Sequence, residues 1–257
     1  MNEEKLSIIP ENNVLINFKY LLLGSCIEES IILIEKGIEF FRKISIGNDN
    51  IAFLSFLFLS RGFELLMKNI LVFKYIKENK KFLSSKELRK YSHNLIKLRD
   101  EILKNYDNLK IKDEKIKKYI DEDNNLLQKK ELNDILEVFN KYASGEGRYY
   151  AFESLDSNNI YELKNPLNQF YGIILENIEN SKSASRRELQ GDQRNIDRMW
   201  NRIIKSNLTP LIYKFLRALT RQFAYSILGD KGLEMSNELV SKYAYMKNKD
   251  ILLYSND

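Results

Sequence analysis

Apolar side chains recur every three or four positions along two long stretches of the N-terminal half of the chain. That spacing places them on one face of an α-helix. It predicts one helix over about residues 17–44, in which Ile27, Ile31 and Ile34 share a stripe, and a second helix over about residues 51–77. The second stretch is apolar on most faces, which is typical of a helix at the centre of a fold.

Capping residues and polar breaks divide the rest of the chain into further predicted helices. Ser84 and Glu87 have the spacing of a capping box, and the polar run 121–125 indicates a break. Asn165 and Pro166 are typical of a helix start. The predicted ranges are about 86–102, 126–143, 165–181, 192–205, 209–229 and 233–247.

These elements predict an all-α protein: an antiparallel helical bundle with additional C-terminal helices and one short irregular or hairpin insertion. The insertion is expected at residues 146–164, where aromatic pairs flank a turn-rich stretch. We therefore expect a four-helix bundle over residues 1–145, with a loop or hairpin and a C-terminal helical region over residues 146–257 packed on it.

Composition narrows the class of protein. At 44% hydrophobic residues the chain of 257 can bury a core, while 30% charged residues and a mean hydropathy of −0.42 argue against a membrane protein. The charges leave no uninterrupted span of about 20 apolar residues. The first residues lack the pattern of a secretory signal, and Cys26 has no partner for a disulfide. We expect a cytoplasmic protein that does not associate with membranes.

The arginines carry more information than the lysines, whose abundance, with asparagine and isoleucine, is typical of an AT-rich coding sequence. Seven of the twelve arginines lie between residues 186 and 221. Arg194, Arg198 and Arg202 are spaced by four and line one helix face, which suits contact with phosphates. Arg217 and Arg221 repeat that spacing on the next predicted helix. The alternative is intramolecular pairing with three nearby carboxylates, those of Glu188, Asp192 and Asp197.

Three charged residues form the narrow polar face of the second predicted helix. Arg61, Glu64 and Lys68 are separated by three and four positions, so they lie one turn apart. They are candidates for a polar cluster beneath the bundle surface, facing His93. The alternative is a solvent face carrying an ordinary Glu64–Lys68 surface pair.

His93 is the only histidine, and its orientation depends on where a helix begins. If one helix runs unbroken over residues 86–100, His93 points away from the apolar stripe and is exposed. If Ser92 or Asn94 caps a new helix, His93 lies at the break and can turn inward.

Two short motifs resemble the HEPN families of prokaryotic helical bundles. A Glu-x-x-x-Lys stretch lies at residues 64–68, and residues 92–98, Ser-His-Asn-Leu-Ile-Lys-Leu, resemble the family's Gly-His-Asp-Leu-x-x-Leu. Arg148 and Tyr149 are similar to an Arg-Tyr pair found further along in many members. The resemblance covers about residues 15–150.

The resemblance implies an RNA-directed protein of a prokaryotic defence or toxin–antitoxin system, a degenerate RNase or toxin that acts as a dimer or with a partner protein. The family's RNase signature is an Arg followed, after four to six residues, by a His on the same helix. Here only three residues separate Arg89 from His93, so the signature is absent and catalysis is left open. The alternative function is a non-catalytic helical interaction module that pairs with an enzyme.

A further candidate for RNA contact lies just beyond the bundle. Arg148 beside Tyr149 suits phosphate contact and base stacking. The alternative is an arginine paired with Glu146 or Glu153. No Gly-rich phosphate loop or Cys/His metal-site spacing occurs, and the run 121–123 is more typical of a solvated link than of a metal site, so we expect no cofactor and no metal.

Overall fold

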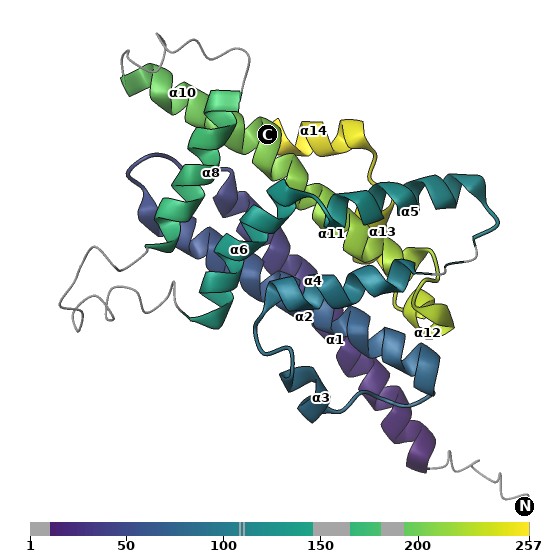
Figure 1. The fold of residues 1–257 in the computed structure, drawn as a ribbon. Helices are drawn as coiled ribbons and strands as arrows, with labels where there is room; N and C mark the ends of the chain where they lie inside the picture. Colours follow the sequence, from purple (N-terminus) through teal and green to yellow (C-terminus); the bar gives the residue numbers. More distant parts are fainter. Residues whose placement is uncertain (1–10, 108, 110, 146–164, 181–192, 257) are drawn as a thin grey trace, which may run out of the picture.

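The computed structural model describes residues 11–107, 109, 111–145, 165–180 and 193–256 (Figure 1). Within these ranges every regular element is a helix and no strand is present. The all-α prediction is therefore confirmed for the described residues. The insertion predicted at residues 146–164 lies outside them.

Helices α1 (Glu11–Phe41) and α2 (Asp49–Asn79) form the central pair. They approach closely because glycines lie at the crossing. A Cβ on Gly62 would be 2.7 Å from Cγ1 of Ile34, and a Cβ on Gly37 would be 2.6 Å from Cγ of Leu59. The stripe predicted around Ile34 is fully buried, so this part of the sequence pattern is confirmed.

By length and composition alone, α2 is the one helix of the described chain that could cross a bilayer. The sequence predicts no membrane span, because charges interrupt this apolar stretch. More than half of the apolar window is buried inside the fold. That burial is typical of the core helix of a folded domain, which has the same hydropathy.

The chain breaks between α3 (Ser85–Arg89) and α4 (Leu95–Leu103). Ser84 and Glu87 form both hydrogen bonds of the predicted capping box. Ser92 takes a positive φ of 49°, and Asn94 then caps α4. The alternative of an unbroken helix over residues 86–100 is wrong. The second alternative, a new helix capped by Ser92 or Asn94 with His93 at the break, is confirmed, and the cap is Asn94.

Helices α5 (Glu114–Leu127) and α6 (Lys130–Ser144) complete the N-terminal half, and here a prediction was wrong. The polar run 121–125 does not break the chain but lies inside α5. Asp113 caps this helix by accepting from the backbone N–H of Lys115 at 2.8 Å, and Ile120, Leu126 and Leu127 provide a buried face. The chain instead breaks at Gln128 and Lys129.

Helix α8 (Pro166–Asn180) starts as predicted, with the Asn165 side chain accepting from the backbone N–H of Leu167 at 2.9 Å. Helix α10 (Gln193–Ile203) continues through a π-helical segment (Ile204–Leu208) into α11 (Thr209–Ala224). The predicted start at Thr209 is therefore a change of helical pitch and not a break.

One helix was predicted over residues 233–247, but the structure has two short helices there, α12 (Gly229–Glu234) and α13 (Glu238–Ala244). A third, α14 (Asn248–Asn256), lies beyond the predicted range. The single-helix prediction is wrong. The side chain of Asn237 accepts from the backbone N–H of Val240 at 3.0 Å and so starts α13 as a separate helix.

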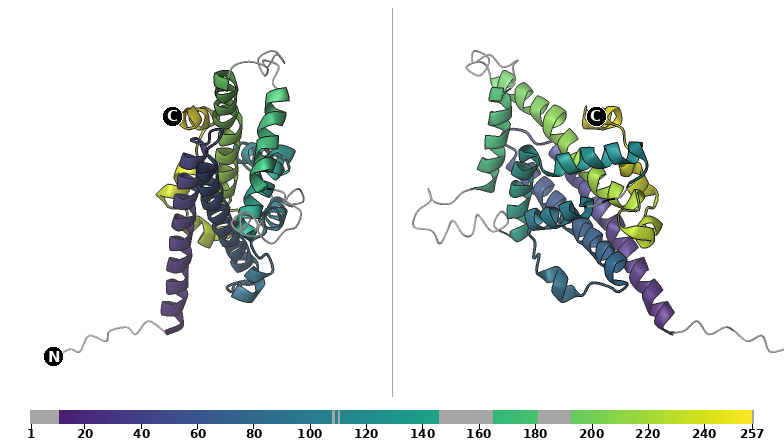
Figure 2. Two further views of the ribbon diagram at one scale, coloured as in Figure 1. Left: turned by 90° about the vertical axis from the view of Figure 1, so that its left-hand side faces the viewer. Right: turned by 45° about the vertical axis from the view of Figure 1, so that its right-hand side comes forward.

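Helix α11 joins the two halves of the chain, because it packs against α2, α5 and α13 (Figures 1 and 2). The ring of Phe215 on α11 lies 4.7 Å from that of Phe63 on α2. The buried apolar residues form one continuous cluster from Ile27 to Ile251. The bundle and the C-terminal helices therefore share a single core.

Candidate functional site

The candidate site centres on a buried carboxylate on α2. Glu64 is only 2% exposed, yet three cationic or titratable side chains surround it. Nζ of Lys68 lies 2.6 Å from Oε1, and Nδ1 of His93 lies 3.0 Å from Oε2. Nη1 of Arg61 lies 3.5 Å from the same Oε2. A buried carboxylate is costly unless it is paired in this way.

The start of α4 places His93 against Glu64. The left-handed backbone at Ser92 turns the chain, and Asn94 caps the new helix by accepting from the N–H of Lys97 at 2.9 Å. The N–H of Leu95 donates to Oδ1 of Asn140 on α6 at 2.8 Å. These bonds fix the start of α4, so that His93, which directly precedes the capping residue Asn94, faces α2.

The electrostatics of Glu64 favour its ionised form. Burial alone would raise the pKa of this carboxyl group, but the hydrogen bonds from Lys68 and His93 outweigh burial and lower the pKa below its ordinary value. An ionised carboxylate can only accept hydrogen bonds, so Nδ1 of His93 must donate. The neutral imidazole therefore carries its proton on Nδ1 and presents Nε2 as an acceptor.

A pocket of about 290 Å³ opens beside the cluster. Arg61, Glu64 and His93 line it together with apolar side chains from α1, α2 and α6, including Leu57 and Tyr142. The side chain of His93 is 51% exposed, and Nε2 has no hydrogen-bond partner among the described residues. The pocket thus combines a free imidazole nitrogen, a half-exposed guanidinium and an apolar wall.

The four residues predicted as a polar cluster, Arg61, Glu64, Lys68 and His93, do meet in the structure. The alternative, an ordinary solvent face, does not describe Glu64, which is buried. The contact between Glu64 on α2 and His93 does not follow from the spacing of residues along one helix, because 29 positions separate the two residues.

The predicted nucleic-acid surface is described only in part. Arg198 and Arg202 are exposed on α10, and neither forms an ion pair with another described residue. Arg148 and Tyr149 lie outside the described residues, as does the side chain of Arg194.

The proposed continuation of that surface through Arg217 and Arg221 is wrong, because both side chains are buried. Nη1 of Arg221 lies 2.9 Å from Oδ1 of Asp123, and its Nε donates to the carbonyl of Ala244 at 3.0 Å. Asp123 is buried on α5, so the interpretation of its run as a solvated link is also wrong. The apolar neighbours of both arginines, such as Leu216, were a signal that this stretch faces the core.

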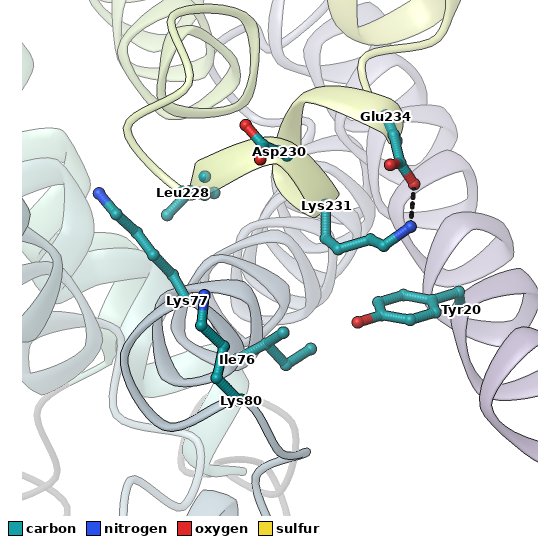
Figure 3. Close-up of a pocket in the computed structure, with 9 residues that line it drawn as sticks. Tyr20, Ile76, Lys77, Lys80, Leu228, Asp230, Lys231 and Glu234 are labelled. Carbon is teal, nitrogen blue, oxygen red and sulfur yellow. Dashed lines mark hydrogen bonds and ion pairs between the residues drawn. The ribbon is translucent and has the colours of Figure 1, made fainter. Parts of the chain in front are cut away.

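A second pocket, of about 600 Å³, lies between α1, α2 and α12 (Figure 3). Two of its lysines are engaged within the chain. Nζ of Lys231 lies 2.6 Å from Glu234, and Nζ of Lys77 donates to the carbonyl of Ile227 at 2.9 Å. Figure 3 shows Lys77 and Lys231 pointing in different directions. This pocket does not gather its cations around one point, as a phosphate site requires.

No group of three or more His, Cys, Asp or Glu side chains gathers within the described ranges in a way that could hold a metal ion. No family model matches the chain, and neither a curated protein nor a solved structure was found to be similar to it. The likeness to HEPN proteins therefore stays a prediction.

Proposed function

We propose that this chain is a HEPN-like, RNA-directed protein of a prokaryotic defence or toxin–antitoxin system, and that the pocket beside His93 receives the RNA backbone. One observation carries the proposal. A buried, ionised Glu64 holds Nδ1 of His93, which leaves Nε2 free in a pocket that the guanidinium of Arg61 also lines.

That arrangement suits a phosphodiester for two reasons. Arg61 is half exposed and has five N–H donors in a planar fork, which matches two phosphate oxygens. The free Nε2 of His93 can accept a proton, which is the role of a general base. Glu64 keeps the imidazole in one tautomer and one orientation, as the acidic member of a catalytic triad does.

The chemistry that this arrangement supports is cleavage of RNA without a covalent enzyme intermediate. Nε2 of His93 takes the proton of a ribose 2′-hydroxyl while that oxygen attacks the adjacent phosphorus. The bond from phosphorus to the 5′-oxygen of the next nucleotide breaks, and the imidazolium returns its proton to that oxygen. The products are a 2′,3′-cyclic phosphate and a free 5′-hydroxyl, so no co-reactant is needed.

The test measures binding and cleavage of a labelled single-stranded RNA by the purified full chain. We compare the wild type with His93→Ala, Arg61→Ala and Arg198→Ala, and use Arg89→Ala as a matched control, since Arg89 is exposed near His93 but does not line the pocket. Loss of one charge-assisted phosphate contact is worth about 1.5–3 kcal/mol, which is roughly a 10- to 100-fold loss of affinity.

We expect Arg61→Ala to weaken binding by about that factor, and His93→Ala to abolish any product that carries a cyclic phosphate. Arg89→Ala should match the wild type. RNA binding that none of the pocket variants changes would contradict the proposal, and so would the absence of RNA binding.

An exposed apolar surface on α1 favours the second candidate function, a helical interaction module. Figure 2 shows the first turns of α1 running beyond the other helices. Their side chains are apolar and exposed, and Leu21 reaches 71% exposure. The exposed residues are Val14, Leu15, Ile16, Phe18, Leu21 and Leu22. Exposed apolar clusters of this kind mark protein–protein contacts.

The partner that fits this surface is a second copy of the chain. Two identical helices that cross on a two-fold axis present the same apolar residues to each other, so the surface is self-complementary. Sedimentation velocity over a range of concentrations should show a dimer for the wild type and a monomer for Leu21→Glu. The control is Leu253→Glu, at a similarly exposed leucine on α14. A wild type that stays monomeric would remove this candidate.

A further inference from the structure

A third pocket lies where α11 meets α5 and the turn between α13 and α14. Its volume is about 400 Å³, in the range of small-molecule sites. It shares no lining residue with the pocket beside His93. Three tyrosines and three cationic residues dominate its lining: Tyr119, Tyr225, Tyr245, Arg217, Arg221 and Lys247.

Arg217 is the unusual member of this lining, because its charge is buried without a counter-charge. The side chain is only 5% exposed. Nη1 donates to the carbonyl of Met246 at 3.2 Å and to Oδ1 of Asn248 at 2.8 Å, both uncharged acceptors. Nε has no hydrogen-bond partner, and no carboxylate of the described residues lies within 4.0 Å of the guanidinium. Buried arginines are ordinarily paired with an acid.

Arg221, one turn along α11, shows the contrast. It is equally buried but forms an ion pair with Asp123. The pair neutralises Arg221, whereas Arg217 forms no ion pair with a described residue. Burial, and then the neighbouring Arg221, lower the pKa of Arg217, which shows how unfavourable the surroundings are for its charge.

The remaining charges around Arg217 add to the positive potential. Lys247 lines the pocket. Lys214 lies near Arg217: burial lowers the pKa of Lys214, and the charge of Arg217 lowers it further. Asp123, and after it Glu122 on the pocket wall, raise the pKa of Arg217, but neither forms an ion pair with it. Among the described lining residues, Arg217 and Lys247 lack an ion-pair partner and face the single carboxylate of Glu122, so the pocket favours an anion.

The tyrosines provide flat surface next to this charge. The rings of Tyr119 and Tyr225 are stacked, with centroids 6.3 Å apart and planes 20° apart. The ring of Tyr245 lies 6.2 Å from that of Tyr225 and its residue is 59% exposed. The guanidinium of Arg221 lies over Tyr119, 4.5 Å from its ring centroid, which holds that ring in place. An open aromatic surface of this kind stacks on planar rings.

We propose that this pocket binds a nucleoside monophosphate, with the phosphate at Arg217 and Lys247 and the base on the exposed face of Tyr245. The ligand supplies the missing counter-charge to Arg217, and its base covers the open tyrosine ring. The site is independent of the proposed RNA pocket, because the two lie on different helices and share no residue.

Isothermal titration calorimetry on the full chain tests the site with four separate probes: AMP, UMP, adenosine and inorganic phosphate. We expect both nucleotides to bind at least about tenfold more tightly than adenosine or phosphate alone, because each of these lacks one half of the contact. Tyr245→Ala should weaken AMP binding about tenfold, within the range measured for base–aromatic stacking. Lys247→Ala should also weaken it.

Matched controls separate local from general effects. Tyr254→Ala removes another partly exposed tyrosine, and Lys249→Ala removes a lysine of the same turn that does not line the pocket. Both should bind AMP as the wild type does. Arg217→Lys keeps the charge but loses the planar fork, so we expect at least a tenfold loss of AMP affinity. If Arg217→Lys does not fold, by far-UV circular dichroism, Tyr245→Ala and Lys247→Ala decide the result.

Three results would overturn the proposal: no binding of AMP or UMP by the wild type, equal affinity for inorganic phosphate and the nucleotides, or AMP affinity unchanged in Tyr245→Ala and Lys247→Ala. None of these depends on RNA binding at His93. His93→Ala should leave AMP affinity unchanged, so the two proposals can fail separately.

Discussion

Replacing Glu64 with glutamine tests the electrostatic account of the candidate site most directly. Glutamine has the same shape, so the packing of α2 is kept and only the charge is removed. Breaking a fully buried pair costs about 3–5 kcal/mol. Lys68 keeps some access to water and His93 is half exposed, so we expect a smaller loss of about 2–3 kcal/mol in the free energy of unfolding.

Glu39→Gln is the matched control, because Glu39 also has two lysine partners. Nζ of Lys36 and of Lys43 lie 2.9 and 2.8 Å from its carboxylate oxygens. The Glu39 side chain is 40% exposed, and although the hydrogen bonds from Lys43 and Lys36 lower its pKa to about 2, solvent screens the pairs. We expect no measurable change for Glu39→Gln. The same number of ion pairs therefore has a different effect at the two sites.

The assay is urea unfolding followed by far-UV circular dichroism at several pH values. The pKa of Glu64 is lower in the folded state than its ordinary value of 4.5, so its contribution is present above that pH and is lost as pH falls through the folded-state pKa. The difference between the wild type and Glu64→Gln should be full at neutral pH and shrink as the pH falls below the ordinary pKa of 4.5. A melting temperature lower by roughly 5–10 °C should accompany it. A difference no larger than that of Glu39→Gln, or one that grows as pH falls, would refute the reasoning.

Three further predictions concern the packing and the buried charges. Asn94→Ala removes the cap of α4 and should cost about 1 kcal/mol in urea unfolding; an unchanged midpoint would mean that the cap does not hold the helix start. Gly62→Ala places a methyl group 2.9 Å from the backbone N of Ile34, and should lower the free energy of unfolding by about 1–3 kcal/mol even though alanine favours helix; a more stable variant would contradict the close crossing. Burial raises the pKa of Asp123 to about 6, so between about pH 4 and pH 6 the folded state keeps a proton that the unfolded state releases. As the pH rises through that window, the wild type should therefore lose stability relative to Asp123→Asn. A shift of the opposite sign in urea titrations would show that Arg221 outweighs burial.

Much of the helical architecture could be predicted from local pattern. The three- and four-residue spacing around Ile34 predicts α1, because burying a stripe of side chains requires that period. The capping box at Ser84 and the cap at Asn165 predicted helix starts correctly, because those hydrogen bonds join residues two or three positions apart. The candidate residues of α2 could be named for the same reason, since one turn separates them.

Contacts between distant segments were decided by the tertiary structure alone. Whether the run around Asp123 is a link or part of a helix depended on Arg221, which lies 98 positions away and pairs with it inside the core. An acidic and asparagine-rich segment such as residues 121–125 indicates a break when judged locally, but burial of one face stabilises it as a helix. The arginines at 217 and 221 have the spacing of a phosphate surface, but the packing of α11 against α5 and α13 buries them. His93 likewise contacts Glu64 because Asn94 caps the start of α4 and Asn140 on α6 accepts a hydrogen bond from its first turn. The cap is local, but the contact with α6 joins distant segments and cannot be predicted from spacing along the chain.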